Sequence, residues 1–245
     1  NKALVANFYD ELIPLAESKG LLFRCTAAVG GGIGWLSEVE RSRRVQKLHK
    51  VGGIMNGTCN YILDNMTRNG LDYAVALKQA QELGYAEADP SADVDGPDTW
   101  NKTIISANIA FDVSLEKASV PVCGIRNIAA VDVAEFTKRG YVCKMMGTAE
   151  KSEDGISAYV QPTLFEKGEP ESTVPANYNL ISFQQEVYTD NAVLTVEPAP
   201  DTMLRVFMAY KPLEYPVRVL PQKLENTERT GFTLVEWGGS RAVVP

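Results

Sequence analysis

The feature that most constrains the fold is a change of sequence pattern at Gly140. Before this glycine, apolar residues recur mainly at helical spacing, whereas after it they form short runs typical of strands, separated by Gly, Pro, Asn and Asp turns. These runs predict strands over residues 141–149, 156–165, 179–188 and 191–198. Because consecutive strands with short turns pair antiparallel, we expect an α+β fold, with a mostly antiparallel or mixed sheet and helices packed on one face.

The first half of the chain is expected to supply the helices. Apolar spacing from Leu4 to Ala16 predicts a helix that Gly20 would end, and residues 21–29 then predict a strand. Residues 121–124 have the composition of a linker. The other expected elements are a strand over 45–55, helices over 35–40, 58–69, 72–83, 97–110 and 131–138, and at most two edge strands within 216–224 and 232–240.

Composition excludes several classes of protein. The net charge is −7 and basic residues cluster only between Arg41 and Lys50, so we expect no nucleic-acid partner. Four scattered cysteines and one histidine argue against a zinc site and against a Ser-His or Cys-His nucleophile. Without a membrane-length apolar run or a signal-peptide pattern, the expected location is the cytoplasm, with no membrane partner. Because the chain starts at Asn1, we expect it to be cut from something longer or processed.

An acidic stretch over residues 83–102 is the strongest candidate for a site. It holds five carboxylates, and Pro97 is well placed to begin a helix. Asp98 and Lys102 would then lie one helical turn apart on the same face. They form either an ordinary surface ion pair or the charged part of a site that holds the ammonium group of an amino acid, and spacing leaves both interpretations open.

Two turns offer further candidate binding positions. The three glycines at 30–32 follow a predicted strand, and they either make a tight turn or let a ligand approach the backbone. They do not complete a GxGxxG dinucleotide fingerprint, because Trp35 stands at the third glycine position. After the turn at 56–57, Thr58 is placed to cap a helix, whose N-terminal N–H groups attract anions.

Four motifs occur together in a characteristic order: NK at 1–2, AAVGGGI at 27–33, GIMNGTCNYIL at 53–63, and ALKQAQELGYAEADPSADVDG at 76–96. With these motifs the chain resembles the substrate-binding and catalytic domain of homoserine dehydrogenases, closely over residues 1–165 and weakly over 166–245. The resemblance implies that domain's fold, as a single domain over residues 1–245. It also implies an NAD(P)-binding Rossmann domain ahead of this region in the intact enzyme.

The resemblance implies NAD(P)-dependent interconversion of L-homoserine and L-aspartate 4-semialdehyde, a step of threonine and methionine biosynthesis. Lys102 would transfer a proton at the alcohol or aldehyde oxygen, and Lys2 would be a second catalytic lysine. The implied substrate-binding residues are Glu87, Asp93, Asp98, Tyr85 and Thr58, and the implied cofactor-binding residues are Asn1, Lys2 and Gly31.

A weak monovalent-cation site is also implied, through the backbone carbonyls of Ala27, Val29 and Gly31. Two departures from the family pattern count against it. Thr26 stands where the family usually has Glu, and Gly34 stands where it usually has Pro.

The first functional hypothesis is therefore an enzyme: the catalytic portion of a homoserine dehydrogenase, acting on a small amino-acid substrate as a homodimer. No tightly bound cofactor is expected on this chain, because the dinucleotide-binding half is missing. The alternatives are a homoserine dehydrogenase-like module that binds an amino acid or oligomerises without turnover, and a related oxidoreductase for another small aldehyde. The choice between NAD and NADP stays open, since the discriminating residue would lie in the cofactor domain.

Overall fold

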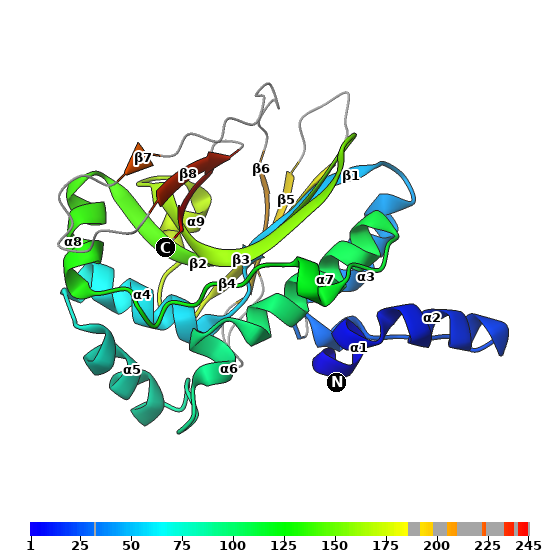
Figure 1. Cartoon of the computed structure of the whole chain (residues 1–245), viewed down its shortest axis with the longest axis horizontal. Helices are drawn as coiled ribbons and strands as arrows, with labels where there is room; N and C mark the ends of the chain where they lie inside the picture. The colour runs from blue at the N-terminus through cyan, green and yellow to red at the C-terminus, as the bar shows by residue number, and fades with distance from the viewer. Residues whose placement is uncertain are drawn as a thin grey trace.

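A computed structural model describes residues 1–31, 33–185, 192–197, 205–209, 222–223, 233–237 and 240–244. At its centre is an antiparallel sheet with the strand order β6-β5-β4-β1-β2-β3-β9-β8-β7 (Figure 1). The expected α+β arrangement is confirmed. The strands are β1 (Leu48–Ile54), β2 (Tyr141–Ser152), β3 (Gly155–Glu166), β4 (Asn179–Gln185), β5 (Ala192–Glu197), β6 (Arg205–Ala209), β7 (Gln222–Lys223), β8 (Thr233–Trp237) and β9 (Ser240–Val244).

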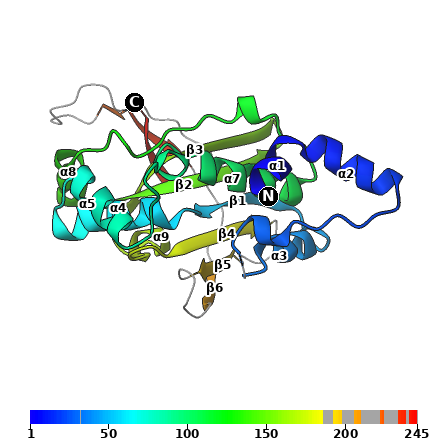
Figure 2. The same cartoon turned by 90° about the horizontal axis from the view of Figure 1, so that it is seen from below.

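Helices cover one face of the central strands, and Figure 2 shows them lying across β1, β2 and β3. The helices in contact with β1 or β2 on this face are α4 (Gly57–Asn69), α7 (Pro97–Phe111) and α8 (Ala130–Lys138), while α3 (Trp35–Arg43) packs on α7 and β4. Further out lie α5 (Tyr73–Glu82) and α6 (Ser91–Val94), and the short α9 (Pro170–Thr173) packs on β2 and β3. None of the helices in the described ranges is long and apolar enough to cross a membrane.

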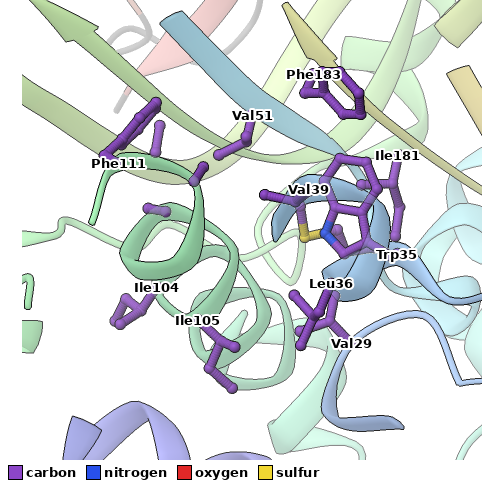
Figure 3. Packing of buried hydrophobic residues seen from close by; sticks show 14 of the residues in the cluster. Val29, Trp35, Leu36, Val39, Val51, Ile104, Ile105, Phe111, Ile181 and Phe183 are labelled. Atoms are coloured by element: carbon purple, nitrogen blue, oxygen red, sulfur yellow. The ribbon is translucent and has the colours of Figure 1, made fainter. Parts of the chain in front are cut away.

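The core beneath α3 and α7 is built around Trp35 (Figure 3). Its ring lies 5.9 Å from that of Phe183 on β4, and its indole N–H donates to the hydroxyl of Ser106 on α7 at 2.9 Å. A buried indole nitrogen needs such a partner. On β2, the neighbours Met145 and Met146 belong to different buried clusters, as expected for adjacent residues of a strand covered on both faces.

The N-terminal region differs from the prediction. The expected first helix is two helices, α1 (Lys2–Asn7) and α2 (Tyr9–Ser18), separated at Phe8. The strand predicted over 21–29 is wrong: residues 21–25 form no strand, and Thr26–Ala28 form a 3-10 turn. A strand needs a neighbour to accept and donate its backbone hydrogen bonds, and the described residues place none there. In Figures 1 and 2, α2 extends away from the sheet.

The two segments predicted as edge strands, 216–224 and 232–240, contain β7 at the edge of the sheet and β8 beside it, and the structure adds β6 and β9, which were not predicted. One other prediction needs correction. The stretch at 121–124 is not a linker. Its backbone forms a parallel bridge with β3, where Cys123 N–H donates to the Val160 carbonyl at 2.8 Å, and Ile125 N–H donates to the Val94 carbonyl of α6 at 2.8 Å. Residues 121–125 therefore join the acidic stretch over residues 83–102, here called the acidic loop, to the sheet.

The backbones of β1 and β4 approach closely at Gly53. Its Cα lies opposite Ile181 of β4 and Gly147 of β2. A Cβ atom added at residue 53 would lie 2.0 Å from the Leu180 carbonyl oxygen, inside any van der Waals contact. Only glycine fits this spacing of the strands.

A fully buried lysine, Lys144 of β2, ties the sheet to α4. Its ammonium group donates to the side-chain oxygen of Asn60 at 2.9 Å and to the Val174 carbonyl at 2.7 Å. Asp64 lies 3.9 Å from it and also accepts the Ala176 N–H at 2.9 Å. These contacts fix the α9–β4 connection against α4. Burial lowers the pKa of Lys144 to about 8, although the Asp64 carboxylate acts in the opposite direction.

Stability should depend on pH through this lysine. The ordinary lysine pKa is 10.5, so between about pH 8 and that value the unfolded chain binds more protons here, and the free energy of unfolding should rise with pH. Lys144→Met removes this contribution. Wild type should therefore gain on the order of 2 kcal/mol relative to the variant between about pH 7 and about pH 10, measured by urea unfolding. Parallel pH profiles for the two proteins would contradict the assignment.

Candidate active site

The candidate site lies where β1 ends and three helices begin. Asn56 follows β1 and caps α4, its side-chain oxygen accepting the Cys59 N–H at 2.8 Å. Gly96, in the left-handed region with φ of 100°, makes the turn into α7, and Pro97 occupies the first turn of α7, as predicted. The turn places Asp98 at the N-terminus of α7, where the helix dipole favours a negative charge.

Asp98 holds two lysines. One carboxylate oxygen is paired with Lys2 of α1, and the other accepts from Lys102 at 2.8 Å. The Asp98 side chain is 9% exposed and that of Lys102 is 16% exposed, so this is not the surface ion pair that spacing had left open. The structure therefore brings together three of the residues proposed for the site: Lys2, Asp98 and Lys102.

The ammonium group of Lys102 is oriented by two acceptors. Besides Asp98, it donates to the Met55 carbonyl at 2.6 Å. An ammonium group has three protons, and these contacts use two of them. The third is the one that Lys102 can offer to a bound molecule.

Asp93 and Asp98 share a donor. The side-chain amide of Asn56 donates to Asp93 at 2.6 Å and to Asp98 at 3.0 Å. Burial raises the pKa of Asp93, with the Asn56 hydrogen bond acting against it. Burial acts the same way on Asp98, but the charge of Lys102 and the hydrogen bonds from Lys102, Lys2 and Asn56 outweigh it and hold the pKa of Asp98 below its usual value.

The remaining proposed substrate residues lie on the loop before α6 and on the first turn of α4. The Thr58 hydroxyl donates to the Tyr85 carbonyl, and the Tyr85 ring, 39% exposed, meets the ring of Tyr61 at 5.1 Å. Glu87 is exposed and its carbonyl accepts from Gln81 at 2.9 Å. No hydrogen bond links the Glu87 carboxylate to the lysines within the described part of the chain, so its role stays a prediction.

The proposed cofactor and cation positions lie near the N-terminus. Asn1 caps α1, its side-chain oxygen accepting the Ala3 N–H at 3.0 Å, which fixes the helix that carries Lys2. Gly31 is exposed. Ala27, Val29 and Gly31 lie along one turn, but hydrogen bonds there involve the carbonyls of Cys25 and Gly30. The role of the Ala27, Val29 and Gly31 carbonyls as cation ligands therefore stays a prediction. No cluster of three or more His, Cys, Asp or Glu suited to a metal occurs in the described ranges.

Sequence reasoning missed three contributors to this site. The Met55 carbonyl is a backbone group, so its contact with Lys102 cannot be predicted from the residue type. Asn56 was interpreted only as part of a turn. Arg126, on the segment that follows the supposed linker, binds Asp95 through two hydrogen bonds of 2.7 and 2.8 Å and so braces the acidic loop.

A cavity of about 1010 Å³ lies at the opposite end of β1 and α7. Among its charged side chains, Arg43 lies 2.6 Å from Asp112, whereas Arg44 and Glu150 pair with Glu40 and Lys50 outside the lining. It contains none of the residues that surround Asp98. Its lining residues are Arg43, Arg44, Lys47, Leu48, His49, Ala110, Phe111, Asp112, Glu150, Lys151, Ser152, Glu153 and Gln184.

Comparison with known proteins identifies the family of the chain. The chain is 39% identical over 183 residues to a homoserine dehydrogenase of Synechocystis, a match that covers 73% of this chain and 42% of the relative. A homoserine dehydrogenase structure from Thiobacillus denitrificans superposes with a TM-score of 0.78 at 32% identity, covering 82% of this chain and 46% of that one. A hyperthermophilic archaeal homoserine dehydrogenase, solved in complex with NADPH, matches at 23% identity and a TM-score of 0.66, covering 82% and 57%.

The chain thus spans about two fifths of the length of the curated relatives it matches. The family profile described as homoserine dehydrogenase matches residues 35–201, a stretch that includes Asp93, Asp98 and Lys102. The chain belongs to the homoserine dehydrogenase family.

Proposed function

We propose that this chain is the substrate-binding and catalytic part of a homoserine dehydrogenase, which interconverts L-homoserine and L-aspartate 4-semialdehyde with NAD(P). The observation that carries the proposal is the buried Asp98 carboxylate between Lys2 and Lys102; Asp98 and Lys102 lie within the segment that matches the family, and Lys2 precedes it. Such a pair of oriented ammonium groups suits proton transfer at an oxygen atom.

In aldehyde reduction, Lys102 donates a proton to the oxygen as it becomes an alcohol, and in the reverse direction it accepts that proton. Its contacts with Asp98 and Met55 leave the third N–H for this oxygen. Lys2, 42% exposed on the other side of Asp98, supplies positive charge beside the same oxygen and can restore the proton from solvent.

The substrate ammonium group needs anionic partners. Glu87 and Asp93 are the proposed ligands, since both lie on the acidic loop that leads into α7. Tyr85 and Thr58 line the same side of the site, where the Thr58 hydroxyl donates to the Tyr85 backbone carbonyl. The exposed position of Glu87 lets it reach a substrate that enters from solvent.

The nicotinamide, when bound, supplies or accepts the hydride. On this chain Asn1, Lys2 and Gly31 would form one wall of its site, and the archaeal relative solved with NADPH supports use of such a cofactor. We place the activity in threonine and methionine biosynthesis in the cytoplasm, with the protein acting as a homodimer.

The alternative is a homoserine dehydrogenase-like module that binds an amino acid or oligomerises without turnover. The acidic residues of this chain are compatible with it, because binding of an ammonium group needs no hydride. A coupled assay of the complete gene product with aspartate semialdehyde and each reduced nicotinamide separates the two: turnover supports the enzyme, and binding without turnover supports the module.

Lys102→Ala in the complete gene product should lower kcat by about 10²–10⁴-fold, the range for a positioned acid or base, with a much smaller change in KM. Steady-state kinetics measure both. Lys78→Ala is the matched control, because Lys78 lies on α5 with 77% of its side chain exposed. If Lys102→Ala kept more than about a third of wild-type turnover, its role in proton transfer would be wrong.

Glu87→Gln should weaken homoserine binding by about 1.5–3 kcal/mol, as expected for loss of a charge-assisted hydrogen bond. A deaminated analogue of homoserine should bind equally to both proteins, since it lacks the ammonium group. Calorimetric titration measures both ligands, and Glu82→Gln, at an exposed position of α5, is the control. Equal losses for homoserine and the analogue would assign Glu87 a structural role.

The 245-residue chain alone should bind neither NAD(H) nor NADP(H) with useful affinity, because its sequence has no dinucleotide fingerprint. It should still bind homoserine weakly through the carboxylates. Calorimetry of the purified chain with each ligand tests this expectation. Micromolar binding of either nucleotide would show that the dinucleotide site is built here.

A further inference from the structure

We propose that Asn56 is a positioning residue for this site: its side-chain amide holds the carboxylates of Asp93 and Asp98 in place and so fixes where Lys102 presents its proton. The inference rests on the proposed function for its catalytic meaning. Its structural claim concerns two carboxylates and can be tested without turnover.

The orientation of the Asn56 amide is fixed from both sides. Its oxygen accepts the Cys59 N–H at the start of α4, and its nitrogen faces two carboxylates, which can only accept. A flipped amide would lose the cap and point its oxygen at Asp93 and Asp98. The side chain is 4% exposed, so water cannot easily replace these partners.

The amide joins the start of α4 to two neighbouring helices that follow 37 and 42 residues later in the chain. It sits at the start of α4, while Asp93 belongs to α6 and Asp98 to α7. Both donor hydrogens are used, one for each carboxylate, at 2.6 and 3.0 Å. The charge of Asp98 raises the pKa of Asp93, so without the shared donor these two acids would repel each other in a buried place.

Asp98 also holds Lys102, together with the Met55 carbonyl. The Met55 carbonyl accepts from its ammonium group at 2.6 Å, and the Asp98 oxygen that accepts from Lys102 also accepts from Asn56. A change in the Asn56 amide therefore alters an acceptor of Lys102 directly. The effect on a reaction at Lys102 would be indirect, through the position of Asp98.

The test uses Asn56→Ser, which keeps a capping oxygen but is too short to donate to both carboxylates. Because the Asn56 hydrogen bond lowers the pKa of both acids, the variant should raise the pKa of Asp93 and of Asp98. Carboxyl ¹³C NMR titration of the 245-residue chain measures this, with Asp93→Asn and Asp98→Asn to assign the signals. Homoserine affinity should fall about tenfold, as for one charge-assisted hydrogen bond.

Asn108→Ser is the matched control. Asn108 is equally buried on α7, but its side-chain oxygen accepts the Leu115 N–H at 2.8 Å, far along the helix from Asp98. It should lower stability while leaving both carboxyl titrations and homoserine affinity unchanged. If Asn56→Ser fails to fold, Asn56→Thr replaces it, because threonine also keeps a capping oxygen, is too short to donate to both carboxylates and adds no charge beside them.

The outcomes separate the two proposals. Raised carboxyl pKa values in the Asn56 variant with an unchanged control support the positioning role, even if wild type binds no homoserine, in which case the proposed function fails alone. Carboxyl titrations that superimpose on those of wild type would overturn the positioning role, whatever the homoserine affinity.

Discussion

The arrangement of this site depends on one buried carboxylate, that of Asp98, which pairs with two ammonium groups. Asp98 is paired with Lys2 and Lys102, and Asp93, joined to it through Asn56, brings a second negative charge. The charges of the two carboxylates and the two ammonium groups cancel. Charged groups in a partly buried site need such compensation. Removing one partner would leave an uncompensated charge.

Local sequence patterns predicted the parts of the site that lie within one element. Pro97 marks the start of α7, and the four-residue spacing of Asp98 and Lys102 places them on one face. The pairing of Lys2 with Asp98 joins residues 96 apart, and no pattern in the sequence alone signals it. Family resemblance assigned both residues to the site but did not predict their pairing. The Met55 carbonyl and the Asn56 amide depend on how β1 meets α7, which is set by packing of the whole sheet.

The fold was predictable to a similar degree. Short apolar runs separated by turns after Gly140 predicted an antiparallel sheet, because consecutive strands joined by short turns pair antiparallel. The strand predicted at residues 21–29 does not form. Its residue types suit a strand, but a strand also needs a neighbouring strand to pair with. Lys144 was not foreseen as a core residue, because a charged side chain inside a strand is usually at the surface.

The segment 121–128 shows how a stretch without regular structure can support a site. Its backbone bonds to β3 and to α6, and Arg126 reaches Asp95 from the same segment. A Cβ at Gly124 would lie 2.2 Å from the Val94 carbonyl, so the contact is made by backbone alone. The acidic loop is thus held between this segment and α7.

The close approach of β1 and β4 at Gly53 has a consequence for the site, although no atom of this glycine touches it. A methyl group there would force the two strands apart, because the Leu180 carbonyl occupies its place. Met55 and Asn56 directly follow β1 and would move with it relative to α7. A substitution at residue 53 would then behave in kinetic experiments like a defect of Lys102, the lysine proposed to transfer the proton.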